Sequence, residues 1–189
     1  MSGILVLGGV RSGKSRLAER IAARFDRVVY VAPGPVPDAH DAEWAARVAA
    51  HQAQRPASWQ TVETGDVPAA IRSADAPCVL VDCLGTWVTR VLDDTGAWDD
   101  RLRAETELAR ATAELAAAVA HTPSTVVLVS NEVGWGVVPA HASGRLFRDA
   151  LGRLNQAMAE VADQVLLVVA GRVLDITDAP AVDAFEAAP

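Results

Sequence analysis

The chain has 189 residues, 51% of them hydrophobic, and a formal net charge of −7 at neutral pH. That length suits a single domain with a substantial core, and no apolar run is long enough to cross a membrane. Because binding to a phosphate backbone needs a basic surface, the acidic charge argues against nucleic acid as the main partner.

The first predicted element is a short buried strand that leads into a glycine-rich loop. Ile4 to Leu7 are apolar, Gly8 to Ser15 match the phosphate-binding pattern G-x-x-x-x-G-K-[ST], and Arg16 to Phe25 have helical periodicity. In this context backbone N–H groups and the positive end of the helix dipole converge on one point. Lys14 would reach the β- and γ-phosphates and the Ser15 hydroxyl would ligate Mg²⁺, so we expect nucleotide binding.

Further strands and helices alternate along the rest of the chain. Strands are expected at 28–32, 59–63, 79–82, 126–130 and 165–170. Helices are expected at 41–54, 98–121 and 145–162, and an amphipathic segment reaches Leu92 after the strand at 79–82. Near-continuous apolar strands separated by helices are typical of a mostly parallel sheet covered on both faces. We therefore predict a single α/β domain of the P-loop NTPase type over residues 1–177 and a frayed tail over 178–189.

Acidic residues follow two of the predicted strands, at the edge where ligands of parallel sheets bind. Asp82 closes one strand in the form expected of a carboxylate that holds Mg²⁺ from a strand end neighbouring the phosphate loop. Glu132 follows the strand at 126–130 and competes for that role. The alternative is that each acid simply caps a loop. We expect Ser15 and Asp82 to be the metal ligands.

The helix expected at 41–54 carries charged residues at a spacing of four. Glu43, Arg47 and His51 line one of its faces. One interpretation is a solvated ion-pair ladder in which the histidine is incidental. In the other, neutral imidazole attacks a phosphorus atom while Arg47 and Arg55 stabilise charge on its oxygens. The residues alone leave both interpretations open.

The two cysteines, Cys78 and Cys83, lie at opposite ends of one predicted strand, too far apart for an unstrained disulfide. We expect reduced, partly buried thiols in a cytoplasmic protein. The N-terminus enters the first strand within four residues, so we expect no signal peptide.

An ordered set of motifs extends from about Ile4 to Gly171. The set comprises Gly8 to Ser15, Tyr30-Val-Ala32, Arg47 to His51 with Arg55-Pro56, Trp59 to Glu63, Val81 to Trp87, Ser130 to Pro139, Arg145 to Asp149, Gly152 to Gln156 and Ala162-Asp163. Taken together these motifs resemble the bifunctional adenosylcobinamide kinase / adenosylcobinamide-phosphate guanylyltransferase family of cobalamin biosynthesis. The phosphate loop alone is shared by many families, whereas the ordered set is specific.

The resemblance implies two reactions. A γ-phosphoryl group passes from ATP or GTP to adenosylcobinamide, and GMP then passes from GTP to the resulting phosphate through a guanylylated histidine, here His51, with Lys14 as the other catalytic residue. The implied nucleotide contacts are Gly8, Gly9, Val10, Arg11, Ser12, Gly13, Lys14, Ser15, Val31, Ala32, Pro33, Gln52, Ala53, Gln54, Arg55, Glu63 and Asp82. The resemblance also implies Mg²⁺ and a homotrimer. Pro33 departs from the family, which usually has threonine there, and Trp87, Trp135 and His141 are candidates for corrinoid contact.

Two other functions fit the phosphate loop. A kinase for a small metabolite would transfer a γ-phosphate and never take up the α-phosphate of GTP. A GTP-dependent switch or binding module would transfer no group, although the chain has no Asn-Lys-x-Asp sequence of the kind that reads guanine.

Overall fold

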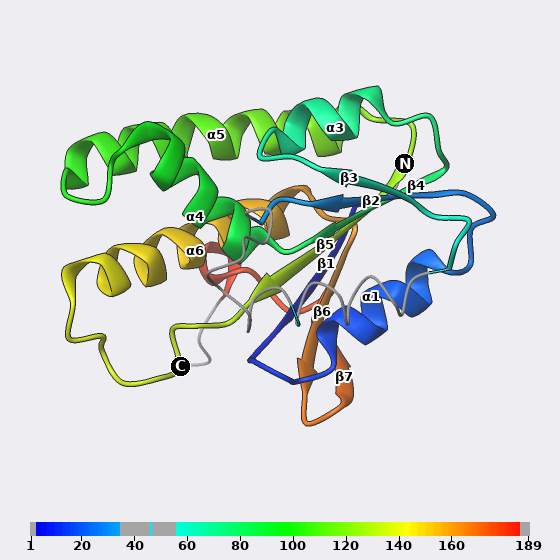
Figure 1. The fold of residues 1–189 in the computed structure, drawn as a ribbon. Helices are drawn as coiled ribbons and strands as arrows, with labels where there is room; N and C mark the ends of the chain where they lie inside the picture. Colours follow the sequence, from blue (N-terminus) through cyan, green and yellow to red (C-terminus); the bar gives the residue numbers. More distant parts are fainter. Residues whose placement is uncertain (1–2, 35–45, 47–55, 186–189) are drawn as a thin grey trace.

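The computed structural model describes residues 3–34, 46 and 56–185, which form a seven-stranded sheet with flanking helices (Figure 1). The strands are β1 (Gly3–Gly8), β2 (Val28–Ala32), β3 (Gln60–Glu63), β4 (Cys78–Asp82), β5 (Thr125–Asn131), β6 (Gln164–Val169) and β7 (Arg172–Asp175). Their order across the sheet is β3-β2-β4-β5-β1-β6-β7. All neighbouring strands pair in parallel except β7, which is antiparallel to β6. The predicted α/β class with a mostly parallel sheet is confirmed.

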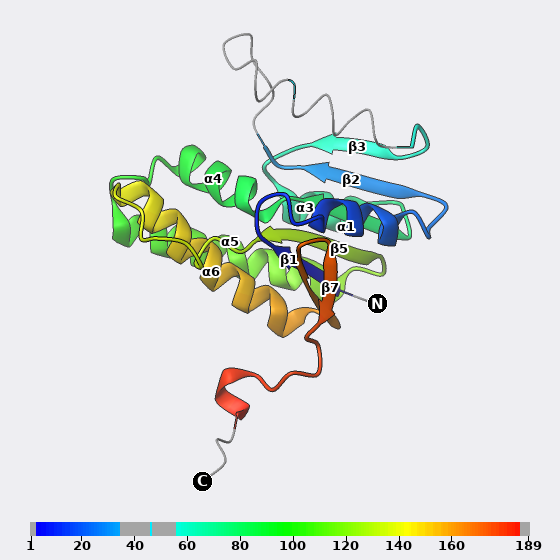
Figure 2. The ribbon, with the colours of Figure 1, turned by 90° about the horizontal axis from the view of Figure 1, so that it is seen from below.

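Helices cover both faces of the sheet (Figure 2). They are α1 (Lys14–Ala22), α3 (Val67–Ser73), α4 (Leu84–Thr95), α5 (Arg101–His121), α6 (Ala142–Val161) and a short 3-10 helix (Val182–Ala184). Side chains of β1 alternate between the two faces, as the strand geometry requires. Leu5 and Leu7 pack with the buried residues of α3, α4, α5 and α6, while Val6 packs with those of α1. The sheet is therefore the middle layer of three.

Two elements of the structure were not expected from the sequence. The strand at 165–170 was expected to be the last, but β7 pairs with β6 after a turn at Ala170 and Gly171, both of which have positive φ. Every residue of β7 is exposed, so it has no buried face to produce an alternating pattern. Helix α3 is only seven residues long and was not predicted, because so short a helix shows few repeats of an apolar face.

Two further observations concern the described part of the chain. Both cysteines are free thiols, and burial raises the pKa of Cys78 to about 12. Within this part, none of the helices is long and apolar enough to cross a membrane. The frayed tail stays a prediction, since residues 178–185 are exposed but contain the short 3-10 helix.

Candidate active site

The phosphate loop connects β1 to α1 at the carboxyl end of the sheet (Figure 1). Gly13 has φ 103°, a left-handed conformation that favours glycine, and it occupies the N-cap position of α1. No side chain caps this helix, and no acidic residue lies in its first turn. The N–H groups of the first turn are therefore open to an anion, as the motif predicts.

Close packing explains why the loop begins with glycine. A Cβ at Gly8 would lie 2.5 Å from Ser12 Oγ and 2.6 Å from the carbonyl oxygen of Val168. The backbone holds Ser12 in place, because its N–H donates to Gly9 O at 3.3 Å and its own carbonyl accepts from the N–H of Gly171 at 3.0 Å. Ser12 Oγ is buried and has no hydrogen-bond partner among the described residues. Such an unpartnered hydroxyl is the kind of group that a bound phosphate oxygen satisfies.

Lys14 lies in the first turn of α1 and is only 8% exposed. Its ammonium donates to Gly9 O at 3.3 Å, which bends the side chain over the loop. Burial raises the pKa of the Cys83 thiol and the Asp82 carboxylate raises it further, whereas hydrogen bonds with Thr86 and the charge of Lys14 lower it. Because the charge of Lys14 acts on Cys83, the phosphate loop lies close to the end of β4.

The order of the strands corrects the expected position of Asp82. It was expected at a strand neighbouring the phosphate-loop strand, but β5 lies between β4 and β1. Asp82 pairs with Val129, which is level with Val6, so it lies about 10 Å from β1 at the usual strand spacing. Glu132, at the end of the neighbouring strand β5, is joined directly to the loop, because its N–H donates to Gly8 O at 3.1 Å.

A buried hydrogen-bond network holds the Glu132 carboxylate. The hydroxyl of Ser130 donates to Asn155 Oδ1 at 2.5 Å. Asn155 Nδ2 then donates to Asn131 O at 3.1 Å and to Glu132 Oε1 at 3.2 Å. Both ends of this amide are satisfied, so its orientation is fixed by its partners.

Sequence reasoning assigned no role to Asn155 or Ser130. The sequence feature that could have indicated Asn155 is its position on the apolar face of α6. Leu151 and Met158, one helical turn before and after it, are fully buried. Buried amides are hydrogen-bonded, so such a position predicts a polar partner inside the fold without identifying it.

The other expected nucleotide contacts lie further from the loop. Val31, Ala32 and Pro33 are at the end of β2, and Val31 is fully buried, so only its backbone could reach a ligand. Glu63 ends β3, an edge strand that lies four strand positions from β1. His51 and the expected contacts Gln52, Ala53, Gln54 and Arg55 lie outside the described residues, so these assignments stay predictions.

The three residues considered for corrinoid contact differ in their exposure to solvent. Trp87 is 2% exposed and its indole N–H donates to Gly65 O at 3.0 Å, so it is a core residue and not a ligand contact. Trp135 is 71% exposed in the connection between β5 and α6. His141 is exposed at the N-cap position of α6.

The oxygen atoms near the loop suit a magnesium ion. Ser15, Asp82 and Glu132 offer a hydroxyl and two carboxylates, which are hard ligands. Within the described ranges, no cluster of three His, Cys, Asp or Glu side chains could hold a metal by itself. Magnesium commonly uses one or two protein carboxylates and takes its other ligands from phosphates and water. The residues present therefore fit an ion that binds together with a nucleotide.

Solved structures share the fold of this chain. A prototypical ATPase from a bacterial type III secretion system superposes with a TM-score of 0.55 at 12% identity, over 88% of this chain and 50% of the other. A protein from Pyrococcus horikoshii superposes with a TM-score of 0.54 at 10% identity, over 97% of this chain and 89% of the other. At these identities the likeness establishes the P-loop NTPase fold alone.

Sequence relatives are far closer. The bifunctional adenosylcobalamin biosynthesis protein CobP of Pseudomonas aeruginosa is 41% identical over 93% of this chain and 98% of its own length. CobU of Escherichia coli, which has the same description, is 41% identical over 89% of this chain and 96% of its own. The family model for cobinamide kinase / cobinamide phosphate guanyltransferase matches residues 4–176. The chain therefore belongs to this family of bifunctional enzymes of cobalamin biosynthesis.

Proposed function

We propose that this chain phosphorylates adenosylcobinamide with ATP or GTP and then transfers GMP from GTP to the product, using one phosphate loop for both reactions. The observation that carries the proposal is the loop itself. The buried ammonium of Lys14, the unpartnered hydroxyl of Ser12 and the uncapped start of α1 form one anion site. Family membership names the acceptor of the phosphate.

The first reaction needs a group that accepts a proton from the acceptor. The hydroxyl oxygen of cobinamide attacks the γ-phosphorus, and the bond from that phosphorus to the β-bridging oxygen breaks, which releases the nucleoside diphosphate. Lys14 stabilises the charge on the transferred group. The Glu132 carboxylate is hydrogen-bonded to Asn155 beside the loop and takes the proton of the hydroxyl. Mg²⁺, when bound through Ser15 and an acid at this edge, supplies further charge neutralisation on the phosphates.

The second reaction proceeds through His51. Neutral imidazole attacks the α-phosphorus of GTP, a nitrogen–phosphorus bond forms, and pyrophosphate leaves. An oxygen of cobinamide phosphate then attacks the same phosphorus, the nitrogen–phosphorus bond breaks, and GDP-cobinamide and free histidine result. The basis for choosing His51 is the family resemblance and its position between Arg47 and Arg55 in the sequence.

Labelling with radioactive GTP tests the covalent step. Incubation of the wild-type chain with GTP labelled at the α-phosphate is expected to leave acid-labile, base-stable label on the protein, as a phosphoramidate requires. His51→Ala is expected to abolish the label and the GMP transfer while it retains γ-phosphate transfer to adenosylcobinamide.

His121→Ala is the matched control. The Nδ1–H of His121 donates to Ala117 O at 2.7 Å at the end of α5, and His121 has no part in the proposed chemistry. Label that persists in His51→Ala assigns the nucleophile to another residue. A wild-type chain that phosphorylates the acceptor but takes up no α-label is a kinase only, and one that binds GTP without either transfer is a binding module.

A further inference from the structure

We infer that a groove between α4 and α6 holds the corrin ring of the cobinamide acceptor. This inference rests on the proposed function, because it assigns a position to the second substrate of the same site. The groove has a volume of about 530 Å³, within the range of small-molecule pockets. It is lined by Thr89, Trp98, Ser143, Gly144 and Phe147.

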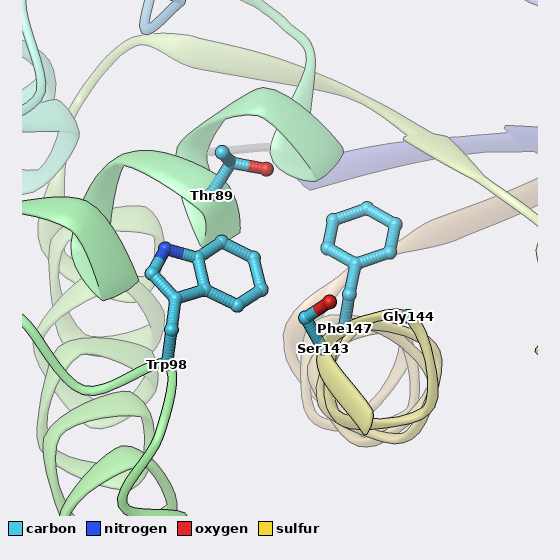
Figure 3. A pocket seen from close by; sticks show the side chains of 5 residues that line it. All are labelled: Thr89, Trp98, Ser143, Gly144 and Phe147. Carbon is cyan, nitrogen blue, oxygen red and sulfur yellow. The ribbon is translucent and has the colours of Figure 1, made fainter. Parts of the chain in front are cut away.

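Two aromatic rings form the walls of the groove. In Figure 3 the indole of Trp98 and the ring of Phe147 both point into the space between the helices, with Thr89 on α4 and Ser143 at the start of α6 beside them. Both rings are partly buried against the core, so their outer faces remain accessible. Aromatic faces of this kind bind large apolar surfaces with little loss of side-chain freedom.

Polar contacts keep the walls in place. The indole N–H of Trp98 donates to Asp93 Oδ1 at 2.6 Å, which fixes the ring and satisfies its only polar group. The Thr89 hydroxyl donates to Gly85 O at 3.3 Å and retains acceptor capacity. The lining thus combines apolar faces with hydroxyl groups at the margin. A corrin ring has a matching surface, since its methylated macrocycle is edged by amide side chains.

The groove lies between two helices that also reach the active site. Phe147 precedes Asn155 by eight residues on α6, or about 12 Å along the helix axis. Asn155 contacts the Glu132 carboxylate, while the start of α6 lies beyond the carboxyl ends of the strands (Figure 1). On α4, a Cβ at Gly85 would lie 3.7 Å from Phe147 Cζ and 3.7 Å from Cys83 Sγ. The groove therefore extends outward from the ends of β4 and β5.

The distance along α6 between the groove and the Glu132 carboxylate suits the shape of the acceptor. The reacting hydroxyl of cobinamide is at the tip of a flexible arm, some distance from the corrin ring. A ring held between Trp98 and Phe147 would place an arm of comparable length along α6 toward Glu132. Ligands of parallel sheets bind outside the carboxyl ends of the strands, which is where the groove lies.

Steady-state kinetics with adenosylcobinamide test the assignment. Trp98→Ala and Phe147→Ala are each expected to raise the KM for the acceptor by about tenfold or more, with little change in the KM for nucleotide. The uptake of α-label from GTP in the absence of acceptor is expected to stay at the wild-type level. Trp98→Phe keeps an aromatic face and is expected to recover most of the affinity.

Further variants separate binding from folding. Ser143→Leu removes no core side chain but narrows the groove, so it is also expected to raise the acceptor KM. Phe185→Ala is the matched control, because Phe185 is 63% exposed and does not line the groove. Its acceptor KM is expected to equal that of the wild type.

The outcomes distinguish this inference from the proposed function. A wild-type chain that neither takes up label nor phosphorylates cobinamide overturns the proposed function itself. Normal labelling with an unchanged acceptor KM in Trp98→Ala, Phe147→Ala and Ser143→Leu overturns the groove alone. A raised KM in Trp135→Ala, with none in the groove variants, would place the ring at the connection between β5 and α6 instead. If Trp98→Ala changes the number of subunits in the assembly, measured as its mass in solution, and leaves the acceptor KM unchanged, the groove is a contact between subunits.

Discussion

Asn155 links the helix α6 to the end of β5 through a fully satisfied amide. Its Oδ1 accepts from Ser130, and its Nδ2 donates to Asn131 O and Glu132 Oε1. The residue is 6% exposed, so a missing partner here would leave a buried polar group unsatisfied. One of its hydrogen bonds reaches the Glu132 side chain, so in the proposed kinase reaction Asn155 would position that carboxylate.

We predict that Asn155→Ala lowers the turnover of the kinase reaction roughly 10- to 100-fold, because the carboxylate loses its orienting donor. The KM for nucleotide should change little, and the free energy of unfolding should fall by about 1–3 kcal/mol. Steady-state kinetics and urea denaturation measure the two effects separately.

The neighbouring amide provides the control for this prediction. Gln156 is exposed on the same helix, so Gln156→Ala is expected to leave both turnover and stability near the wild-type values. A stability loss in Asn155→Ala with unchanged turnover would show that the network serves the fold and not the reaction.

The sequence predicts the site only where its residues are contiguous. Gly8 to Ser15 form a local motif whose strand, turn and helix all follow from adjacent residues. The network of Ser130, Glu132 and Asn155 joins positions far apart in the chain, and no local pattern specifies which side chains meet. Asp82 was correctly placed at a strand end, but its distance from the loop depends on pairing between strands.

At the scale of elements, two glycines in helices have opposite structural roles. Gly96 ends α4 with φ 61°, and Gly152 lies inside α6. A Cβ added at either position would meet nothing within 4 Å. Substitution by alanine therefore changes the backbone energy without a steric clash.

We predict that Gly96→Ala lowers the free energy of unfolding by about 1 kcal/mol, because an L-residue resists the left-handed conformation. Gly152→Ala should raise it by about 0.5–1 kcal/mol, because alanine is the better helix former. Thermal denaturation should show shifts of about 2–4 °C per kcal/mol, in opposite directions for the two variants. Tm shifts in the same direction for both variants would contradict this account of the two positions.

Helix boundaries show how far local patterns predict elements. The helix expected from Trp98 begins instead at Arg101, because the side chain of Asp100 accepts from the N–H of Arg103 at 3.0 Å and caps it. Strand β7 depends on its pairing with β6 and on the turn at Gly171, since its side chains bury nothing. Long elements with a buried face were predictable, whereas the short helix α3, the capped start of α5 and the partner-dependent strand β7 were not.

For the whole molecule, the position of β5 between β4 and β1 decides that the end of β5, and not that of β4, lies beside the phosphate-loop strand. Sequence order gives the elements of a parallel sheet but leaves their order across it open. The homotrimer also stays a prediction. Val169, Val173 and Leu174 leave exposed apolar surface on the β6–β7 edge of the described chain, a feature compatible with contact between copies.

A ligand that binds only the folded chain must stabilise it, which gives a test of the loop that needs no acceptor. At about 100 times its dissociation constant, GTP with Mg²⁺ should add about 2.7 kcal/mol to the free energy of unfolding. For a chain of this size that corresponds to a rise in Tm on the order of 5–10 °C. Chelation of Mg²⁺ should reduce the rise, because the metal neutralises the phosphates.

Lys14→Ala should remove most of this ligand-dependent rise, since its buried ammonium lies against the loop and donates to Gly9 O at 3.3 Å. Each variant is compared with itself, with and without GTP, so any change in intrinsic stability cancels. Arg20→Ala removes an exposed cation from the last turn of the same helix and should retain the full rise. An undiminished rise in Lys14→Ala would mean that the nucleotide is held elsewhere than at Gly8 to Ser15, and both proposed reactions would then need a different phosphate site.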